Sequence, residues 1–189
     1  MAAMDPPPLT DGVIFLRPLY VTDAAAHLAG EDDEIAVYLS GGKSTEETVR
    51  TYIQRSLEEW RNDGPVRALG VFSCVDASLV GSIEANLSLP TLKARQVNLS
   101  YSVFLEWRGQ GIAVRAVRLM CDYLQTCTDS AEVIIQIVPS NHASARVAEK
   151  AGFRFEGLQH ESDTPMLRYS LDLQSHRIHQ SLMGIPQQF

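Results

Sequence analysis

The chain has 189 residues, of which 45% are hydrophobic and 21% are charged, and its formal net charge at pH 7 is −7. This length and composition suit one globular domain with a buried core and exclude an intrinsically disordered protein. The negative charge argues against a nucleic-acid-binding protein, which usually presents a basic face, and is compatible with a cationic partner.

The cysteines and the N-terminal segment favour a cytoplasmic protein. Cys74, Cys121 and Cys127 are an odd number without a close pairing pattern, which indicates reduced thiols. No stretch approaches the ~20 apolar residues of a membrane span. The opening sequence MAAMDPPPLTDG lacks the basic and apolar regions of a secretion signal. We therefore expect neither secretion nor contact with a membrane.

The first third of the chain predicts a strand and a long helix. Residues 1–10 contain three consecutive prolines and are expected to form an extended lead-in. The apolar run Val13–Leu19 predicts the first strand. Ser44 and Glu47 show the spacing of a capping box, which predicts the start of a helix that runs to about Trp60.

The middle of the chain predicts a β-hairpin followed by a strand–helix–strand unit. Two strand-like runs flank the turn at 76–78. Apolar and polar residues alternate over Gln96–Leu105, which predicts a strand, and the helical spacing after it predicts a helix to about Gln125. Glu132–Pro139 is nearly all apolar, as in a strand covered on both faces. Because a helical crossover joins parallel strands, the unit indicates an α/β fold.

The C-terminal part predicts a short helix and two further strands. The sequence NHASARVAEKAGF begins with Asn141 as an N-cap and ends near Gly152 as a C-cap. Strands are expected at FRFEGL and MLRYSLDL. No repeat or linker interrupts this pattern, so we predict one domain over residues 11–175 and a C-terminal tail at 176–189.

The sequence WRGQGIAVRAV, from Trp107, lies between a predicted strand and a predicted helix. At such a junction, backbone N–H groups and the positive end of the helix dipole can hold an anion. Gly109 and Gly111 fit a dinucleotide-binding turn G-x-G-x-x-G, but Val114 occupies its third position. A phosphate loop at SGGKST fails similarly, because Val37 stands in place of its first glycine.

A third pattern, R-x-x-G-x-A, is formed by Arg108, Gly111 and Ala113. Here the sequence resembles the GNAT family of acyl-CoA-dependent N-acyltransferases, whose pyrophosphate loop is Q/R-x-x-G-x-G/A between the fourth strand and the third helix. NHASARVAEKAGF is similar to the family's second cofactor motif, in the branch that includes RimJ and RimL. The resemblance covers roughly residues 11–173.

The resemblance implies the GNAT fold and an acetyl transfer. The expected fold is a mixed, mostly antiparallel sheet of about seven strands, with a splayed parallel pair at strands 4 and 5 and about four flanking helices. Acetyl-CoA would be the co-substrate, without a metal, and a primary amine would attack it directly in a ternary complex. The acceptor is left open between a protein N-terminus, a polyamine and a small-molecule amine, and a homodimer would be common in the family.

Two alternative functions stay open. The domain could bind acyl-CoA without catalysis, as a sensor or scaffold, or it could use another donor such as succinyl-CoA. The first alternative rests on two usual family residues that are missing: Ala148 replaces a tyrosine acid, and Asn98 replaces a glutamate on the fourth strand.

The resemblance also implies a set of donor-binding residues. The backbone of the fourth strand would pair with the amides of pantetheine, and the glycine loop would hold the pyrophosphate, since glycine lets the backbone approach a ligand closely. Asn141 and Ser144 would meet the pantetheine arm, although both can also serve as simple helix caps. The implied residues are Val103, Phe104, Arg108, Gly109, Gln110, Gly111, Ile112, Ala113, Asn141 and Ser144.

N-acyl transfer requires a base, because an ammonium has no lone pair, and an acid for the leaving thiolate. The thioester oxyanion would be stabilised by N–H groups of the fourth strand. By its match to RimL-like enzymes Ser144 is the candidate acid, and a carboxylate after the next strand is a candidate base. The candidate catalytic residues are Ser144, Asp163, Glu161 and Glu84.

Two further features concern charge and metal binding. Between Glu31 and Trp60, eight acidic residues stand against three basic ones. This excess indicates either a solvated helix surface or attraction for a cationic acceptor, and the resemblance places the segment near the acceptor. His176 and His179 could form a metal pair on a helix, but no third ligand accompanies them, so no metal site is predicted.

Overall fold

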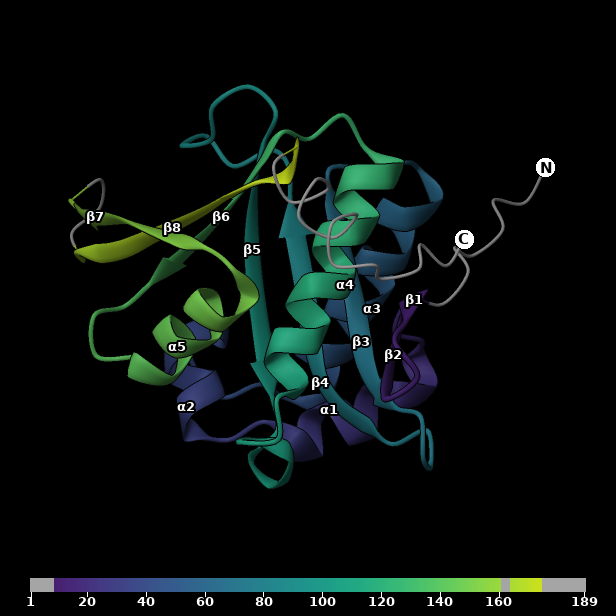
Figure 1. Cartoon of the computed structure of the whole chain (residues 1–189). Coiled ribbons are helices and arrows are strands. Elements are labelled where there is room, and N and C mark those ends of the chain that lie inside the picture. Colours follow the sequence, from purple (N-terminus) through teal and green to yellow (C-terminus); the bar gives the residue numbers. More distant parts are fainter. Residues whose placement is uncertain (1–8, 161–163, 175–189) are drawn as a thin grey trace.

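The computed structural model describes residues 9–160 and 164–174. Within them, eight strands form one sheet in the order β1-β2-β3-β4-β5-β6-β8-β7 (Figure 1). Every neighbouring pair is antiparallel except β5 and β6, which are parallel. The strands are β1 Leu9–Thr10, β2 Ile14–Arg17, β3 Val66–Ser73, β4 Leu79–Asn86, β5 Gln96–Val103, β6 Glu132–Ile137, β7 Arg154–Gln159 and β8 Met166–Asp172.

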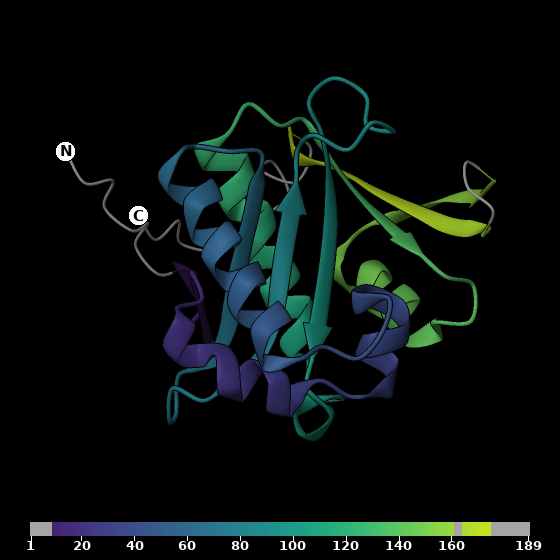
Figure 2. The ribbon, with the colours of Figure 1, turned by 180° about the vertical axis from the view of Figure 1, so that it is seen from behind.

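Helices cover both faces of this sheet. Helices α4 and α5 lie on one face, and α1 and α3 lie on the other (Figures 1 and 2). A π-helical turn, η2, continues the short α2, and the turns η1 and η3 precede α1 and α4. The bounds are η1 Val21–Asp23, α1 Ala24–Gly30, α2 Asp33–Ile35, η2 Ala36–Ser40, α3 Glu46–Arg61, η3 Leu105–Trp107, α4 Ile112–Cys127 and α5 His142–Ala151.

The predicted mixed sheet with one parallel pair is confirmed. The seven expected strands are β2 to β8, and the two-residue β1, which pairs with β2, is an addition at the sheet edge. The lead-in before residue 9 and the predicted tail at 176–189, with His176 and His179, lie outside the described residues.

The capping box predicted from Ser44 and Glu47 is wrong by one residue. Thr45 Oγ1 accepts a hydrogen bond from the N–H of Thr48 at 3.2 Å, and Thr48 Oγ1 accepts from the N–H of Thr45 at 2.8 Å. Ser44 instead donates its N–H and its hydroxyl to the carboxylate of Glu31, at 2.7 and 2.6 Å. A charged acceptor forms the stronger hydrogen bond, so Ser44 is drawn to Glu31 and α3 begins one residue later.

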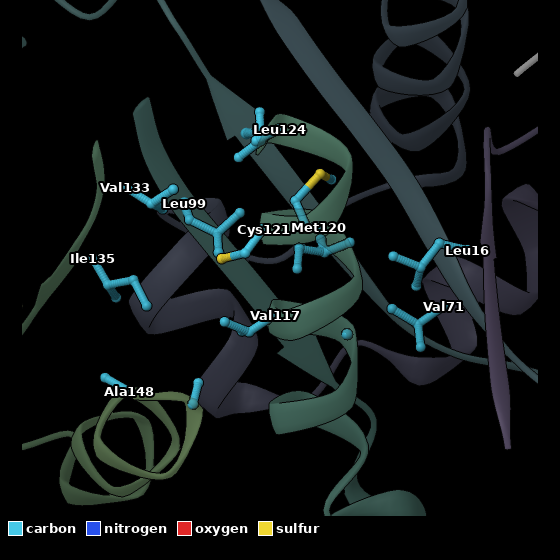
Figure 3. Close-up of a cluster of buried hydrophobic side chains, with 14 of the residues drawn as sticks. Leu16, Val71, Leu99, Val117, Met120, Cys121, Leu124, Val133, Ile135 and Ala148 are labelled. Carbon is cyan, nitrogen blue, oxygen red and sulfur yellow. The ribbon is translucent and has the colours of Figure 1, made fainter. Parts of the chain in front are cut away.

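The core lies between α4 and the sheet (Figure 3). The buried stripe on α4 follows the predicted helical spacing, and each fully buried aliphatic side chain stabilises the fold by about 1.5–3 kcal/mol relative to exposure. Burial raises the pKa of the Cys121 thiol, as expected for a packing residue. Core residues of α4 are Ala116, Val117, Met120, Cys121 and Leu124, and they pack with Leu16, Val71, Leu99 and Val133 of the sheet.

The parallel strands β5 and β6 stay together for only three residue pairs, which end at Asn98 and Ile134. Beyond this point β5 continues along β4 to Val103, whereas β6 continues along β8 to Ile137. Figure 1 shows β6, β7 and β8 turning away from β5. The sheet therefore opens between its two central strands, and one edge of β5 is left without a partner strand.

Candidate functional site

A cavity of about 610 Å³ lies at the opening between β5 and β6. Its walls come from the second half of β5, the end of β6, the loop before α4, the first turns of α5, and the α2–η2 segment. This volume lies within the range of natural small-molecule sites. The separation of β5 from β6 thus contributes to this cavity.

The free edge of β5 presents polar backbone groups to this cavity. The N–H of Phe104 donates to the carbonyl of Val80 at 2.9 Å, so Phe104 faces β4. Because bonded and non-bonded residues alternate along an antiparallel pair, Tyr101 and Val103 direct their N–H and C=O groups to the side that β6 has left. Of the two strand residues predicted from the sequence, Val103 faces the cavity with its backbone and Phe104 does not.

The glycine loop forms an open surface at the mouth of the cavity. Gly109 and Gly111 have φ values of +75° and +81°, and a Cβ at either position would meet no atom within 4 Å. Helix α4 follows at once, and the first N–H groups of a helix, here those of Ile112 and Ala113, lack partners inside it. Together with the helix dipole, these groups suit an anion. Gln110 is exposed on the same loop.

Arg108 is held by the protein's own acceptors. Its Nη1 and Nη2 each lie 2.8 Å from a carboxylate oxygen, of Glu34 and Asp32 respectively. Its Nε donates to the carbonyl of Val103 at 2.9 Å. Burial alone would raise the pKa of Asp32, but the bond and the charge of Arg108, together with the N–H of Ile35, lower it. The guanidinium therefore joins the end of β5 to the N-cap and the first turn of α2, and the anion site depends mainly on backbone N–H groups.

The start of α5 supplies two more of the predicted residues. Asn141 Oδ1 accepts from the N–H of Ser144 at 3.0 Å, so Asn141 caps the helix, and the residue also borders the cavity. The hydroxyls of Ser144 and Tyr101 lie 2.9 Å apart, and Tyr101 also donates to the Ser144 carbonyl at 3.1 Å. Burial raises the pKa of Tyr101 to about 12, so its phenol stays protonated and can donate.

A second cavity, of about 340 Å³, lies under α1 and α3. The residues that line both cavities are Ile35 and Leu39 of the α2–η2 segment and Ser100, Tyr101 and Ser102 of β5. The predicted residue Glu84 is in the wall of the second cavity and accepts a hydrogen bond from the Tyr52 hydroxyl at 3.2 Å. Burial raises the pKa of Glu84, although the bond from Tyr52 and the charge of Arg55 oppose this rise. The two cavities therefore meet at β5.

The other predicted bases cannot be placed, because Glu161 and Asp163 lie outside the described residues. Over 9–160 and 164–174, no group of three or more His, Cys, Asp or Glu side chains could hold a metal ion. Sequence analysis missed His27 and Tyr52, which also line the second cavity. Neither belongs to a motif, and only the helical spacing of Tyr52 with Val49 and Ser56 indicated that it faces inward.

None of the helices described here is long and apolar enough to cross a membrane.

Comparison with known proteins identifies the family of this fold. Residues 14–154 match the family model described as an acetyltransferase (GNAT) domain. The probable N-acetyltransferase YjcK of Bacillus subtilis (strain 168) is 28% identical over 151 residues, which are 77% of this chain and 82% of that protein.

Solved structures share the fold over most of their length. The ribosomal-protein-S5-alanine acetyltransferase from Vibrio fischeri superposes with a TM-score of 0.74 at 16% identity, covering 88% of this chain and 97% of that one. RimJ from Mycobacterium smegmatis, in complex with CoA-disulfide, gives a TM-score of 0.72 at 21% identity and covers 94% and 93% of the two chains. These likenesses confirm the fold that the sequence motifs implied.

Proposed function

We propose that this chain, which belongs to the GNAT acetyltransferase family and is an acyl-CoA-dependent N-acetyltransferase, moves an acetyl group from acetyl-CoA to a primary amine in a ternary complex. One observation carries the proposal: the two cavities adjoin along β5, where they share Ser100, Tyr101 and Ser102. We name the 610 Å³ cavity the donor cavity and the 340 Å³ cavity the acceptor cavity.

Acetyl-CoA would bind in the donor cavity chiefly through backbone groups. The N–H and C=O groups of Tyr101 and the N–H of Val103 would pair with the pantetheine amides, and the amide nitrogen of Asn141 would meet the same arm. The N–H groups from Gly109 to Ala113 would hold the pyrophosphate, where the helix dipole adds about 0.3–1 kcal/mol per charge. The CoA adduct named for the M. smegmatis RimJ structure supports a CoA ligand in this fold.

The transfer itself needs a proton acceptor, an oxyanion site and a proton donor. An amine that enters as ammonium would give one proton to Glu84, and its lone pair would then form the C–N bond at the thioester carbonyl. An N–H of β5 would stabilise the oxyanion until the C–S bond breaks. As the C–S bond breaks, Ser144 would protonate the departing thiolate and would regain a proton from the newly acylated nitrogen, with Tyr101 hydrogen-bonded behind it. Asp163 and Glu161 remain alternative bases.

The proposal also concerns the chemical class of the amine acceptor. A protein N-terminus, a polyamine and a small-molecule amine all supply the required primary amine. The name of the V. fischeri relative, a ribosomal-protein acetyltransferase, favours a protein acceptor. We place the reaction in the cytoplasm, a proposal supported by the free thiols of Cys74, Cys121 and Cys127.

Calorimetry with a matched pair of glycine variants tests the donor cavity. Gly111→Val and Gly12→Val both introduce a side chain at positive φ, +81° and +83°, with no atom within 4 Å of the new Cβ. Each should lose roughly 1–2 kcal/mol of stability from backbone strain. Only Gly111→Val blocks the ligand, so acetyl-CoA binding should weaken about 100-fold in this variant alone.

Measurement of free CoA released with a panel of amines then distinguishes acetyl transfer from the two alternative functions. A sensor would bind acetyl-CoA and release no CoA with any amine. An enzyme with another donor would bind and consume succinyl-CoA in preference to acetyl-CoA. If neither acyl-CoA bound to the wild-type protein, the proposal would be overturned.

A further inference from the structure

Helix α5 contributes two cationic side chains to the wall of the donor cavity. Helices α4 and α5 lie on the same face of the sheet (Figure 1), and Arg118 Nη2 of α4 donates to the carbonyl of Lys150 at 2.7 Å. Residues three and four apart are neighbours on a helix surface, so Arg146 and Lys150 lie next to each other. The residues of α5 that border the cavity are Ala143, Ser144, Arg146, Val147 and Lys150.

These two cations are available for a ligand. The described part of the chain provides no salt bridge to Arg146 or to Lys150. Glu149, the one acid of α5, accepts a hydrogen bond from the Tyr169 hydroxyl at 3.4 Å instead. Arg108, the remaining cationic residue of the cavity wall, already pairs with two carboxylates of the chain. The side-chain charge that this cavity offers to an anion is therefore on α5.

Lys150 has a structural role that Arg146 lacks. Lys150 lies in the last turn of α5, where the helix dipole favours a cation. Arg146 lies in the middle of the same helix, is exposed, and gains little from the dipole. A ligand is therefore the better explanation for Arg146, and Lys150 can serve the helix and the ligand together.

An acyl-CoA carries an anionic group beyond its pyrophosphate. The proposed contacts serve the pantetheine amides and the pyrophosphate, and they leave the ribose 3′-phosphate without a partner. A phosphate monoester carries about 1.5–2 negative charges at pH 7, and the guanidinium of an arginine can bind two of its oxygens. Because the net charge of the chain is −7, such a group needs cations close to it.

We infer that Arg146 and Lys150 bind the 3′-phosphate of the CoA moiety and make the protein selective for CoA over dephospho-CoA, which has a 3′-hydroxyl instead. The inference rests on the proposed function. It assigns the specificity for the nucleotide end of the donor to α5, whereas the glycine loop holds a pyrophosphate that both nucleotides share.

Calorimetry with CoA and dephospho-CoA tests this inference without an amine. The two nucleotides differ only in the 3′-phosphate, so the ratio of their Kd values isolates this group. The ratio is measured for the wild type, Arg146→Gln, Lys150→Gln, the double variant and a control, Arg61→Gln. Like Lys150, Arg61 is an exposed cation in the last turn of a helix, but it belongs to α3, on the other face of the sheet (Figure 2).

The wild type should bind CoA about tenfold more tightly than dephospho-CoA, the effect of one or two charge-assisted hydrogen bonds at an exposed site. Arg146→Gln should reduce this ratio to about threefold and the double variant to below about twofold. Lys150→Gln should have a smaller effect than Arg146→Gln, because an ammonium cannot bind two oxygens as a fork. Arg61→Gln should leave the ratio unchanged. The wild-type ratio should also shrink between about 0.1 and 1 M salt, which screens exposed charges.

A wild type that binds both nucleotides equally, or a double variant that keeps the wild-type ratio, would overturn the inference. An equal loss of affinity for CoA and dephospho-CoA in Arg146→Gln would also overturn it, because the guanidinium would then contact a part that both share. Thermal unfolding checks that each variant is folded, and Arg146→Lys, which keeps the charge, should retain part of the ratio.

The fate of the proposed function is read separately. Selective binding of CoA without turnover of any amine would overturn the proposed transfer and leave the role of Arg146 and Lys150 standing. A wild type that binds neither CoA nor acetyl-CoA would remove the proposed function and this inference with it.

Discussion

The two cavities that meet at β5 are constructed in different ways. The polar groups that we assign to the donor are mainly backbone: the free edge of β5, the loop at Gly109 and Gly111, and the first turn of α4. The acceptor cavity presents side chains from α1, α3 and β4, among them His27, Tyr52 and Glu84. A backbone site suits a ligand part that is constant, as the CoA moiety is. A side-chain site can change with each substitution and therefore suits the variable amine.

Arg108 shows that the acidic segment supplies partners for cations of the same chain. It follows β5 beside the donor loop, and its guanidinium pairs with Asp32 and with Glu34, which also lines the donor cavity. Lys43 similarly pairs with Asp33 at 3.0 Å. Several carboxylates of the acidic segment are thus paired with cationic side chains of the same chain. This distribution leaves Glu84 as the stronger candidate for contact with a cationic acceptor.

Replacement of Glu84 should have the largest effect on activity. It should also distinguish the functions of the two cavities most clearly. Glu84→Gln keeps an acceptor for the Tyr52 hydroxyl but cannot take a proton from the amine. We expect kcat/KM for amines to fall by about 10²–10⁴, the range of general acid–base catalysis, while acetyl-CoA binding stays within about twofold. Steady-state kinetics and calorimetry measure the two quantities. An equal loss in acetyl-CoA binding would show that the cavities are not independent.

The same variant has a predictable effect on stability. Burial raises the pKa of Glu84, so the protonated carboxyl favours folding below its unfolded pKa, and this contribution is lost as pH rises through the folded pKa. Ionised Glu84 therefore destabilises the protein at pH 8. Glu84→Gln should be at least as stable as the wild type there in urea unfolding, and its advantage should shrink toward pH 4. Lower stability at pH 8 would contradict this assignment.

Asn141 offers an intermediate effect that separates a structural role from a binding role. Asn141→Asp keeps the oxygen that accepts from the N–H of Ser144 but removes the amide donor. Stability should change by less than about 0.5 kcal/mol, whereas Asn141→Ala should lose about 1 kcal/mol with the cap. Acetyl-CoA affinity of Asn141→Asp should fall about tenfold. Unchanged affinity in calorimetry would leave Asn141 as a helix cap alone.

Arg108 should give the smallest effect on the donor side. Arg108→Gln leaves Asp32 and Glu34 without their common cation, so the free energy of unfolding should fall by about 1–2 kcal/mol. Acetyl-CoA affinity should fall by less than about tenfold, because the loop N–H groups remain. KM for the amine should rise when the acidic segment loosens. A hundredfold loss of acetyl-CoA affinity at unchanged stability would place Arg108 on the pyrophosphate instead.

The sequence by itself determined most elements and the glycine loop at the mouth of the donor cavity. Strand alternation, helical spacing and caps at Asn141 and Gly152 are local patterns, and the structure has each of them. The donor loop is also local, since Arg108, Gly109 and Gly111 are close along the chain between β5 and α4. Such patterns can be recognised because backbone hydrogen bonds and the periodicity of burial depend on neighbouring residues.

Only the tertiary structure decided the acceptor cavity and the partners of its charges. His27, Tyr52 and Glu84 come from three separate elements, and no spacing in the sequence brings them together. Ser44 likewise bonds to Glu31 across 13 residues instead of forming the predicted cap. The physical reason is that such side-chain contacts depend on how helices pack on the sheet, and local sequence patterns carry no information about that packing.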